Sequence, residues 1–213
     1  MDPFDYFNSN ENTRKDFFYR EYSPGASNRM YFSVENAGKI DWLRYTIEQW
    51  KVNDLLDYGE YEYLLASLIE SISKVANTAG VYGAYLKKWD PRALKKMEFI
   101  PVPRNEDRNP INISENNFFN EKLENIIGQV ETDILYLDPP YTQNQYGTQY
   151  HLLETLIKMD NPSISPITGS RPTGPMRSDW SKEFKVNILL DKILSETTAR
   201  YVLMSYSDCL LYT

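Results

Sequence analysis

Apolar residues recur at three- and four-residue spacing in two stretches of the first half of the chain. The first stretch predicts a helix over residues 35–50, with Ser33 placed to cap its first turn. The second begins near residue 60, and its apolar stripe is wide enough to pack against the first helix as a hairpin. The apolar positions are Ile40, Leu43, Ile47 and Trp50 in the first helix and Tyr61, Leu64, Leu65, Leu68, Ile69, Ile72, Val75 and Ala76 in the second.

The pattern changes near residue 118, where continuous apolar runs alternate with helical spacing. The run over residues 133–137 predicts a buried parallel strand, because such a strand carries apolar side chains on both faces. A second strand is predicted over residues 200–205. Strands that alternate with helices indicate an α/β sheet in this half of the chain. The helices expected here cover residues 120–127, 152–159 and 182–194.

Three segments lack a sustained period. Residues 1–32 are polar and aromatic, and we expect irregular structure there. Residues 77–83 contain two glycines and an asparagine, which predicts a loop with unusual backbone angles. Residues 160–180 are rich in proline and form a long loop, which a compact domain seldom keeps without a functional reason.

Composition limits the classes of protein that fit. The chain has 213 residues, 41% of them hydrophobic, so it is long enough to bury a core. Its net charge of -7 argues against broad coating of DNA and requires any nucleic-acid contact to be local. No apolar run is long enough for a membrane span and no signal peptide is recognisable, so we expect a cytoplasmic protein without membrane contact. One local basic group comprises Lys87, Lys88, Arg92, Lys95, Lys96 and Arg104.

The strand over residues 133–137 is followed at once by Asp138-Pro139-Pro140-Tyr141. A carboxylate and a neighbouring main-chain carbonyl can each accept one hydrogen of a planar amino group, which directs its nitrogen lone pair toward an electrophile. Two prolines stiffen the loop at a strand end, where α/β sheets place their ligands. Tyr141 offers a face for stacking on a base.

This string and its neighbours resemble the adenine-specific DNA methyltransferases of the Dam-like alpha group, the D-twelve class of restriction-modification systems. The resemblance implies a partial Rossmann-like methyltransferase sheet, S-adenosylmethionine as methyl donor without a metal, and double-stranded DNA as substrate. It makes residues 138–141 catalytic, residues 33–117 a mainly helical target-recognition region, and residues 118–213 the C-terminal part of the catalytic domain. The similar segments are Phe32-Ser33-Val34-Glu35-Asn36, Ile40-Asp41, residues 75–84, Gln145-Tyr146, Tyr150-His151-Leu152-Leu153, Asp160-Asn161-Pro162, Arg177-Ser178-Asp179-Trp180 and Ser205-Tyr206-Ser207.

Three further residues are candidates for contact with DNA. Asn77 can read adenine, and Lys87 and Lys88 can read guanine or hold phosphate. A helix C-cap is an equally good interpretation of Asn77. A solvated charged face is the simplest alternative for the two lysines.

Four residues near the Asp138 loop are candidates for the substrate or donor site. Tyr146 and Tyr150 are placed to line the base pocket, with ordinary packing as the alternative. His151 is placed to touch the flipped nucleotide or the donor, with a local hydrogen bond as the alternative. Asp138 and Arg177 are the donor-site candidates, and Arg177 alternatively holds a phosphate or pairs with Asp179.

The methyl-donor site of such enzymes needs a glycine-rich turn that allows close backbone approach, but the nine glycines here include no Gly-x-Gly. We therefore expect a chain truncated at both ends, or one whose donor-binding half is a separate polypeptide. By itself it is expected to bind S-adenosylmethionine weakly or not at all.

Two other functions remain open from the sequence. The first is an RNA adenine methyltransferase, which shares the chemistry, although Asp at the motif's first position favours adenine and the long helical insert favours DNA. The second is a non-catalytic remnant that binds DNA or a partner subunit through the helical region.

Overall fold

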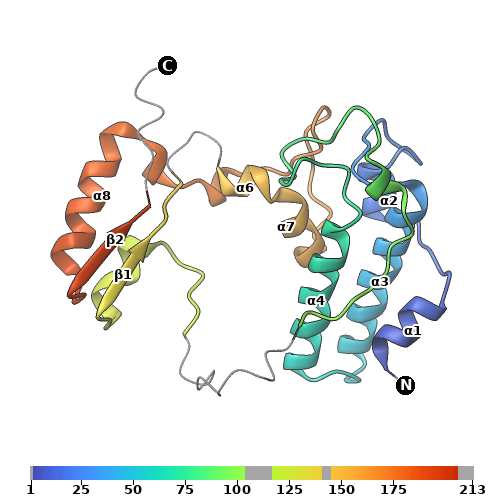
Figure 1. The fold of residues 1–213 in the computed structure, drawn as a ribbon, viewed down its shortest axis with the longest axis horizontal. Coiled ribbons are helices and arrows are strands. Elements are labelled where there is room, and N and C mark those ends of the chain that lie inside the picture. Colours follow the sequence, from blue (N-terminus) through green and yellow to red (C-terminus); the bar gives the residue numbers. More distant parts are fainter. Residues whose placement is uncertain (1, 104–116, 141–144, 206–213) are drawn as a thin grey trace. The chain divides into compact units, whose positions relative to one another are not determined.

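The computed structural model describes residues 2–103, 117–140 and 145–205, and Figure 1 shows its elements. The chain divides into two compact units. The helical unit comprises Met1–Arg104 and Gly147–Thr173, and the sheet unit comprises Asn105–Tyr146 and Gly174–Thr213. Residues 147–173, which we grouped with the catalytic part, thus pack with the predicted recognition region. The functional assignment of the three ranges stays a prediction.

The described elements of the helical unit are helices and a 3-10 turn, whereas those of the sheet unit also include two strands. Those of the helical unit are α1 (Pro3–Ser9), α2 (Phe17–Tyr22), α3 (Val34–Val52), α4 (Tyr58–Ser73), the 3-10 turn η1 (Pro91–Leu94) and α7 (His151–Lys158). Those of the sheet unit are α5 (Leu123–Ile126), β1 (Ile134–Leu137), α8 (Glu183–Glu196), β2 (Tyr201–Met204) and the 3-10 turns η3 (Ile127–Gln129), η4 (Gly174–Met176) and η5 (Asp179–Ser181). The short α6 (Tyr146–Gln149) crosses the boundary between them.

The predicted helical hairpin is confirmed by α3 and α4, which pack against each other (Figure 1). Ser33 caps α3 by accepting a hydrogen bond from the Asn36 amide, as its position predicts. The second helix begins at Tyr58, two residues earlier than expected, because Asp57 and Glu60 form a reciprocal capping box. Strong caps therefore begin both helices of the hairpin.

The expectation of irregular structure over residues 1–32 is wrong, because α1 and α2 lie there. Asp2 caps α1, while the first turn of α2 is held by a distant side chain, Asp41 on α3. The Asp41 carboxylate accepts hydrogen bonds of 2.9 to 3.0 Å from three backbone amides, and its burial raises its pKa to about 6. Helices of 7 and 6 residues are too short to show an apolar period in the sequence. Their stability depends on tertiary contacts such as those of Asp41. The three donors are the amides of Asp16, Phe18 and Tyr19.

Arg44 joins α3 to the end of α7. Its guanidinium is buried and donates hydrogen bonds to the main-chain oxygens of Leu156 (2.9 Å) and Ile157 (3.0 Å). It also donates to Glu48 (2.8 Å) and to the Tyr61 hydroxyl (3.2 Å). The last carbonyls of a helix lack partners within the helix, so Arg44 supplies donors that α7 needs.

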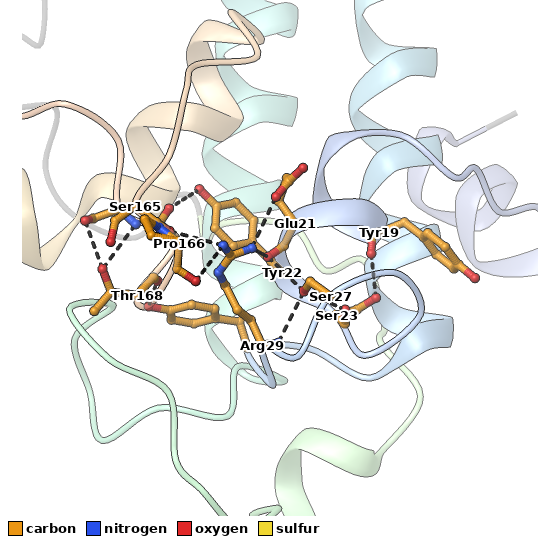
Figure 2. Close-up of polar contacts among 12 residues, drawn as sticks. Tyr19, Glu21, Tyr22, Ser23, Ser27, Arg29, Ser165, Pro166 and Thr168 are labelled. Carbon is orange, nitrogen blue, oxygen red and sulfur yellow. Dashed lines mark hydrogen bonds and ion pairs between the residues drawn. The ribbon is translucent and has the colours of Figure 1, made fainter.

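The long loop predicted after α7 is held in place over residues 165–169. The main-chain oxygens of this stretch accept hydrogen bonds from side chains of the N-terminal segment (Figure 2). Gly169 adopts a φ of 72°, and a Cβ there would lie 2.9 Å from Arg29 Cδ, so the close approach requires glycine. The pairs are Arg29 with Ser165 and Pro166 (both 3.1 Å), Tyr31 with Thr168 (2.8 Å) and Tyr22 with Gly169 (3.1 Å).

The two predicted strands pair in parallel, with Ile134 opposite Tyr201 and Leu137 opposite Met204. The described residues thus form an α/β arrangement, with one apolar face of the sheet packed in a core that includes Ile193 of α8. Burial on both faces is a wrong prediction for the sheet unit by itself, because no described segment of that unit covers the other face, which leaves its apolar side chains exposed. The exposed side chains are Ile134 (57%), Tyr136 (62%), Tyr201 (55%) and Leu203 (58%).

Candidate functional site

Asp138 stands at the carboxyl end of β1, where parallel sheets place catalytic groups. Leu137 before it is buried, and the Ser205 amide donates to the Leu137 oxygen at 2.8 Å, which holds the strand end in place. Pro139 is buried, whereas the Asp138 side chain is exposed. The carboxylate is therefore accessible on a fixed backbone. The fourth residue of the motif, Tyr141, lies outside the described residues.

Gln145 fastens the far end of this loop to another segment of the sheet unit. Its Oε1 accepts from the Ser178 amide at 2.8 Å, and its Nε2 donates to Ser181 Oγ at 2.6 Å. Trp180 lies between these partners in sequence and is buried in the same core as Leu137. Sequence reasoning did not identify this role of Gln145, because a contact across more than 30 residues leaves no local signal.

Arg177 is exposed and precedes the segment that Gln145 holds. The predicted alternative, an ion pair with Asp179, is not formed. Asp179 instead pairs with Lys182 (2.6 Å) and Lys185 (2.7 Å), and hydrogen bonds from these lysines lower its pKa to about 2. Within the described residues no ion pair engages Arg177, so its guanidinium can meet an anionic ligand.

Asn77 has a structural position, contrary to the prediction that it contacts DNA. Its side chain is fully buried, and its amide nitrogen donates to the oxygens of Met30 (2.9 Å) and Leu86 (3.0 Å). Its amide oxygen accepts from the Asp90 backbone at 2.9 Å. Because these bonds use both amide hydrogens, Asn77 holds its loop together and cannot read a base in this conformation. It is not a helix cap either, since α4 ends at Ser73.

The loop that Asn77 holds has an exposed tip, Ala79–Val81. The predicted unusual backbone angle is confirmed at Gly80, whose φ is 103°. Lys87 and Lys88 follow the tip, and both side chains are exposed with no ion pair to any described residue. These two lysines therefore keep the accessibility that phosphate contact requires.

Tyr146 and Tyr150 are partly exposed, at 46% and 42% of their surface. They lie in α6 and directly before α7, but they belong to different units. Their exposure is compatible with the predicted base pocket, and the role of each stays a prediction.

His151 is fully buried, so the prediction that it touches a nucleotide or the donor does not fit this conformation. Its Nε2 lies 2.8 Å from the Tyr82 oxygen and donates to it, because a carbonyl can only accept. Burial lowers the pKa of His151 to about 4, so the ring is neutral near pH 7. The alternative interpretation, a local hydrogen bond, matches this geometry.

The low pKa of His151 predicts a pH dependence of stability. Between pH 6.5 and about 4 the unfolded histidine binds a proton that the native ring does not, so acidification removes stability. We expect the free energy of unfolding of the wild type, minus that of His151→Gln, to fall by up to about 3 kcal/mol across this range. Urea denaturation at several pH values measures it. Contributions of other groups, including Asp41, cancel in the difference, and a constant difference would contradict the prediction.

One cavity of about 250 Å³ lies between α2, α3 and the end of α7, with Asp41, Arg44 and Thr155 in its wall. None of the residues predicted for the site lines it. Asp41 and Arg44 are engaged in the helix-end contacts described above.

Comparison with known proteins identifies a family over almost the whole chain. The family of D12 class N6 adenine-specific DNA methyltransferases matches residues 2–207. The Modification methylase LlaI of Lactococcus lactis subsp. lactis is 39% identical over 209 residues, which is 97% of this chain and 33% of that protein. The Type II methyltransferase M.FokI of Planomicrobium okeanokoites is 40% identical over 193 residues, 90% of this chain and 29% of that protein. No solved structure matches the chain significantly.

A third relative, the Type II methyltransferase M.NlaIII of Neisseria lactamica, is 36% identical over 196 residues, 92% of this chain and 57% of that protein. The chain therefore spans about a third of the length of the first two relatives and somewhat more than half of the third. The described helices include none long and apolar enough to cross a membrane.

Proposed function

Because this chain belongs to the D12 class N6 adenine-specific DNA methyltransferases, we propose that it transfers a methyl group to the exocyclic amino nitrogen of adenine in duplex DNA. The observation that carries the proposal is the position of Asp138 and Pro139 at the carboxyl end of a parallel strand. The carboxylate is exposed there, and the backbone behind it is held by a buried proline and the Ser205 amide. S-adenosylmethionine is the proposed methyl donor.

In the proposed mechanism, the Asp138 carboxylate and the Pro139 carbonyl each accept one hydrogen of the adenine amino group. The lone pair is thereby withdrawn from the ring and directed at an electrophile. S-adenosylmethionine, when bound, would supply the methyl group: the nitrogen–carbon bond would form as the carbon–sulfur bond breaks with its electron pair on sulfur. The amino group would release one proton to water, which reaches the exposed Asp138 carboxylate. Fixed acceptors need no reorganisation during the reaction, so positioning and charge supply the acceleration. Tyr141 is proposed to stack on the flipped base.

The DNA-binding part of the proposal rests on Lys87 and Lys88, two exposed residues that follow the exposed tip Ala79–Val81 along the chain. A net charge of -7 opposes general attraction of the chain to phosphates, so local cations must supply the attraction. Two exposed lysines that follow an exposed loop meet this condition. Asn77 is no longer part of the contact set, for the reasons given above.

The donor site of the proposed function has two candidate residues in this chain, Asp138 and Arg177, and the sequence contains no Gly-x-Gly turn. We propose that the sheet belongs to a larger Rossmann-like arrangement and that segments beyond these 213 residues, on the same or on a separate polypeptide, supply the other donor contacts. The exposed apolar face of β1 and β2 supports this, since parallel sheets normally bury both faces.

Arg177→Met is expected to weaken binding of one anionic substrate about tenfold, because a charge-assisted hydrogen bond is lost. An increase in KM for DNA that shrinks as the salt concentration is raised assigns the guanidinium to phosphate, because a phosphate contact contributes less at high salt. An increase in KM for S-adenosylmethionine assigns it to the donor carboxylate. Lys182→Met is the matched control, since that ammonium already pairs with Asp179. Unchanged KM values for both substrates would remove Arg177 from the site.

The proposed function is tested by incubating the chain with duplex DNA and radiolabelled S-adenosylmethionine at millimolar concentration. The high concentration is used because weak donor binding is expected. Label in N6-methyladenine of duplex DNA supports the proposal. Label only in structured RNA would favour an RNA adenine methyltransferase, and DNA binding without label would favour a non-catalytic remnant.

A further inference from the structure

Two segments far apart in the sequence meet at the main chain of Tyr82. The Tyr82 amide donates to the Gln149 oxygen at 2.7 Å, and the Tyr82 oxygen accepts from His151 Nε2 at 2.8 Å. Tyr82 therefore has both of its backbone groups bonded to the segment 149–151. All of these residues belong to the helical unit.

The contact is completely shielded from water. His151 is fully buried and Tyr82 is 4% exposed, so water does not replace the His151 donor when it is lost. The Tyr31 hydroxyl also donates to the Tyr82 oxygen, at 3.1 Å, so His151 supplies the shorter of two buried hydrogen bonds to this carbonyl. The His151 ring also packs against the rings of Tyr22 and Tyr31, and the centre of each tyrosine ring lies 6.1 Å from the centre of the histidine ring. This contact between Tyr82 and the segment 149–151, called the link below, is therefore stabilised by both hydrogen bonds and packing.

Each side of this link leads directly to an exposed group. On one side, Val81 adjoins Tyr82 and belongs to the tip Ala79–Val81, which the exposed lysines follow in the chain. On the other side, Tyr150 adjoins His151 and is 42% exposed. The segment of Tyr150 follows the Asp138 loop along the chain. A displacement of the tip that reaches Tyr82 therefore acts on hydrogen bonds to the two residues that flank Tyr150, Gln149 and His151.

We propose that His151 is a positioning residue that couples the tip Ala79–Val81 to Tyr150, so that duplex DNA engaged by the tip adjusts Tyr150 for the reaction. This inference rests on the proposed function for the identity of the ligand. The coupling itself is a property of the chain alone and is measurable without DNA or donor. His151 acts through Tyr82 and touches no substrate.

The first test compares amide hydrogen exchange in the full chain for wild type, His151→Leu and His151→Gln. His151→Leu removes the donor, and we expect about tenfold faster exchange at the amides of both Tyr82 and Glu154, the latter in the first turn of α7. The glutamine amide can donate again to the Tyr82 oxygen and should restore protection at both. Lys158→Met, an exposed change in the same helix that removes the ion pair of Lys158 with Glu154, is the control for local effects on α7 and should leave Tyr82 unchanged.

A second variant keeps the test decisive if His151→Leu fails to fold. Val81→Gly loosens the exposed tip without touching the core and should accelerate exchange at Glu154 as well as at Tyr82. Acceleration at Tyr82 alone, or at neither position, would overturn the coupling.

Activity provides a readout that a purely structural histidine would not move. In the methylation assay, His151→Leu should lower kcat about tenfold with little change in KM for DNA, and His151→Gln should recover it. Equal loss in both variants would overturn the positioning role. Absence of methylation by the wild type contradicts the proposed function only, because the exchange experiments judge the coupling independently.

Discussion

Asp138→Ala is expected to lower kcat for methyl transfer to duplex DNA by about 1,000-fold. The substitution removes one of the two acceptors that draw the adenine lone pair out of the ring. It leaves the fold intact, because the carboxylate is exposed and the strand end is held by backbone contacts. Initial rates with labelled donor and a duplex substrate measure the effect. Affinity for DNA should change little, since the carboxylate acts mainly in the transition state.

Two further variants complete this experiment: Asp138→Asn keeps the size of the side chain, and Asp133→Asn is the control. The amide nitrogen of the asparagine at 138 cannot accept, so an intermediate loss is expected. Asp133 is an exposed carboxylate at the opposite end of the same strand, and its replacement should leave kcat within about twofold. Full activity in Asp138→Ala would remove the catalytic assignment, whatever its effect on DNA binding.

Arg44→Met is expected to give the largest loss of stability, about 3 to 5 kcal/mol in the free energy of unfolding. Methionine retains much of the apolar stem but removes every donor. The main-chain oxygens of Leu156 and Ile157 and the Glu48 carboxylate then lose the Arg44 donor. Urea denaturation followed by circular dichroism measures the change.

Arg20→Met is the matched control for Arg44. Arg20 lies in the wall of the same cavity, but its side chain is exposed. Its replacement should change the free energy of unfolding by less than about 0.5 kcal/mol. Similar losses in both variants would show that Arg44 stabilises through general charge and not through its bonds to the end of α7.

The amphipathic elements were predictable because their signals are local. Helices α3 and α4 follow the spacing of their apolar residues, and their caps lie within four residues of the groups they bond. The parallel pairing of β1 and β2 also follows the predicted strand–helix–strand order. Sequence reasoning failed at α2, because its first turn depends on Asp41, more than 20 residues away.

The same distinction between local signals and distant contacts applies to the candidate site. The motif at residues 138–141 is a continuous string, so the residues themselves predict its chemistry. The family match covers this part of the chain, and the roles of the four residues stay a prediction. Asn77 and His151 were assigned to ligands because their side chains are chemically able to bind them. Only burial showed that both are engaged by backbone groups of the protein itself.

The sequence alone predicted the class of chemistry and the order of the main helices and strands, since both predictions depend on neighbouring residues. Tertiary structure alone decided which polar side chains remain accessible: it buried Asn77 and His151, and left Arg177 and Asp138 exposed. The physical reason is that a side chain's access to a ligand depends on which distant backbone groups need its hydrogen bonds. That demand arises only after the chain has folded.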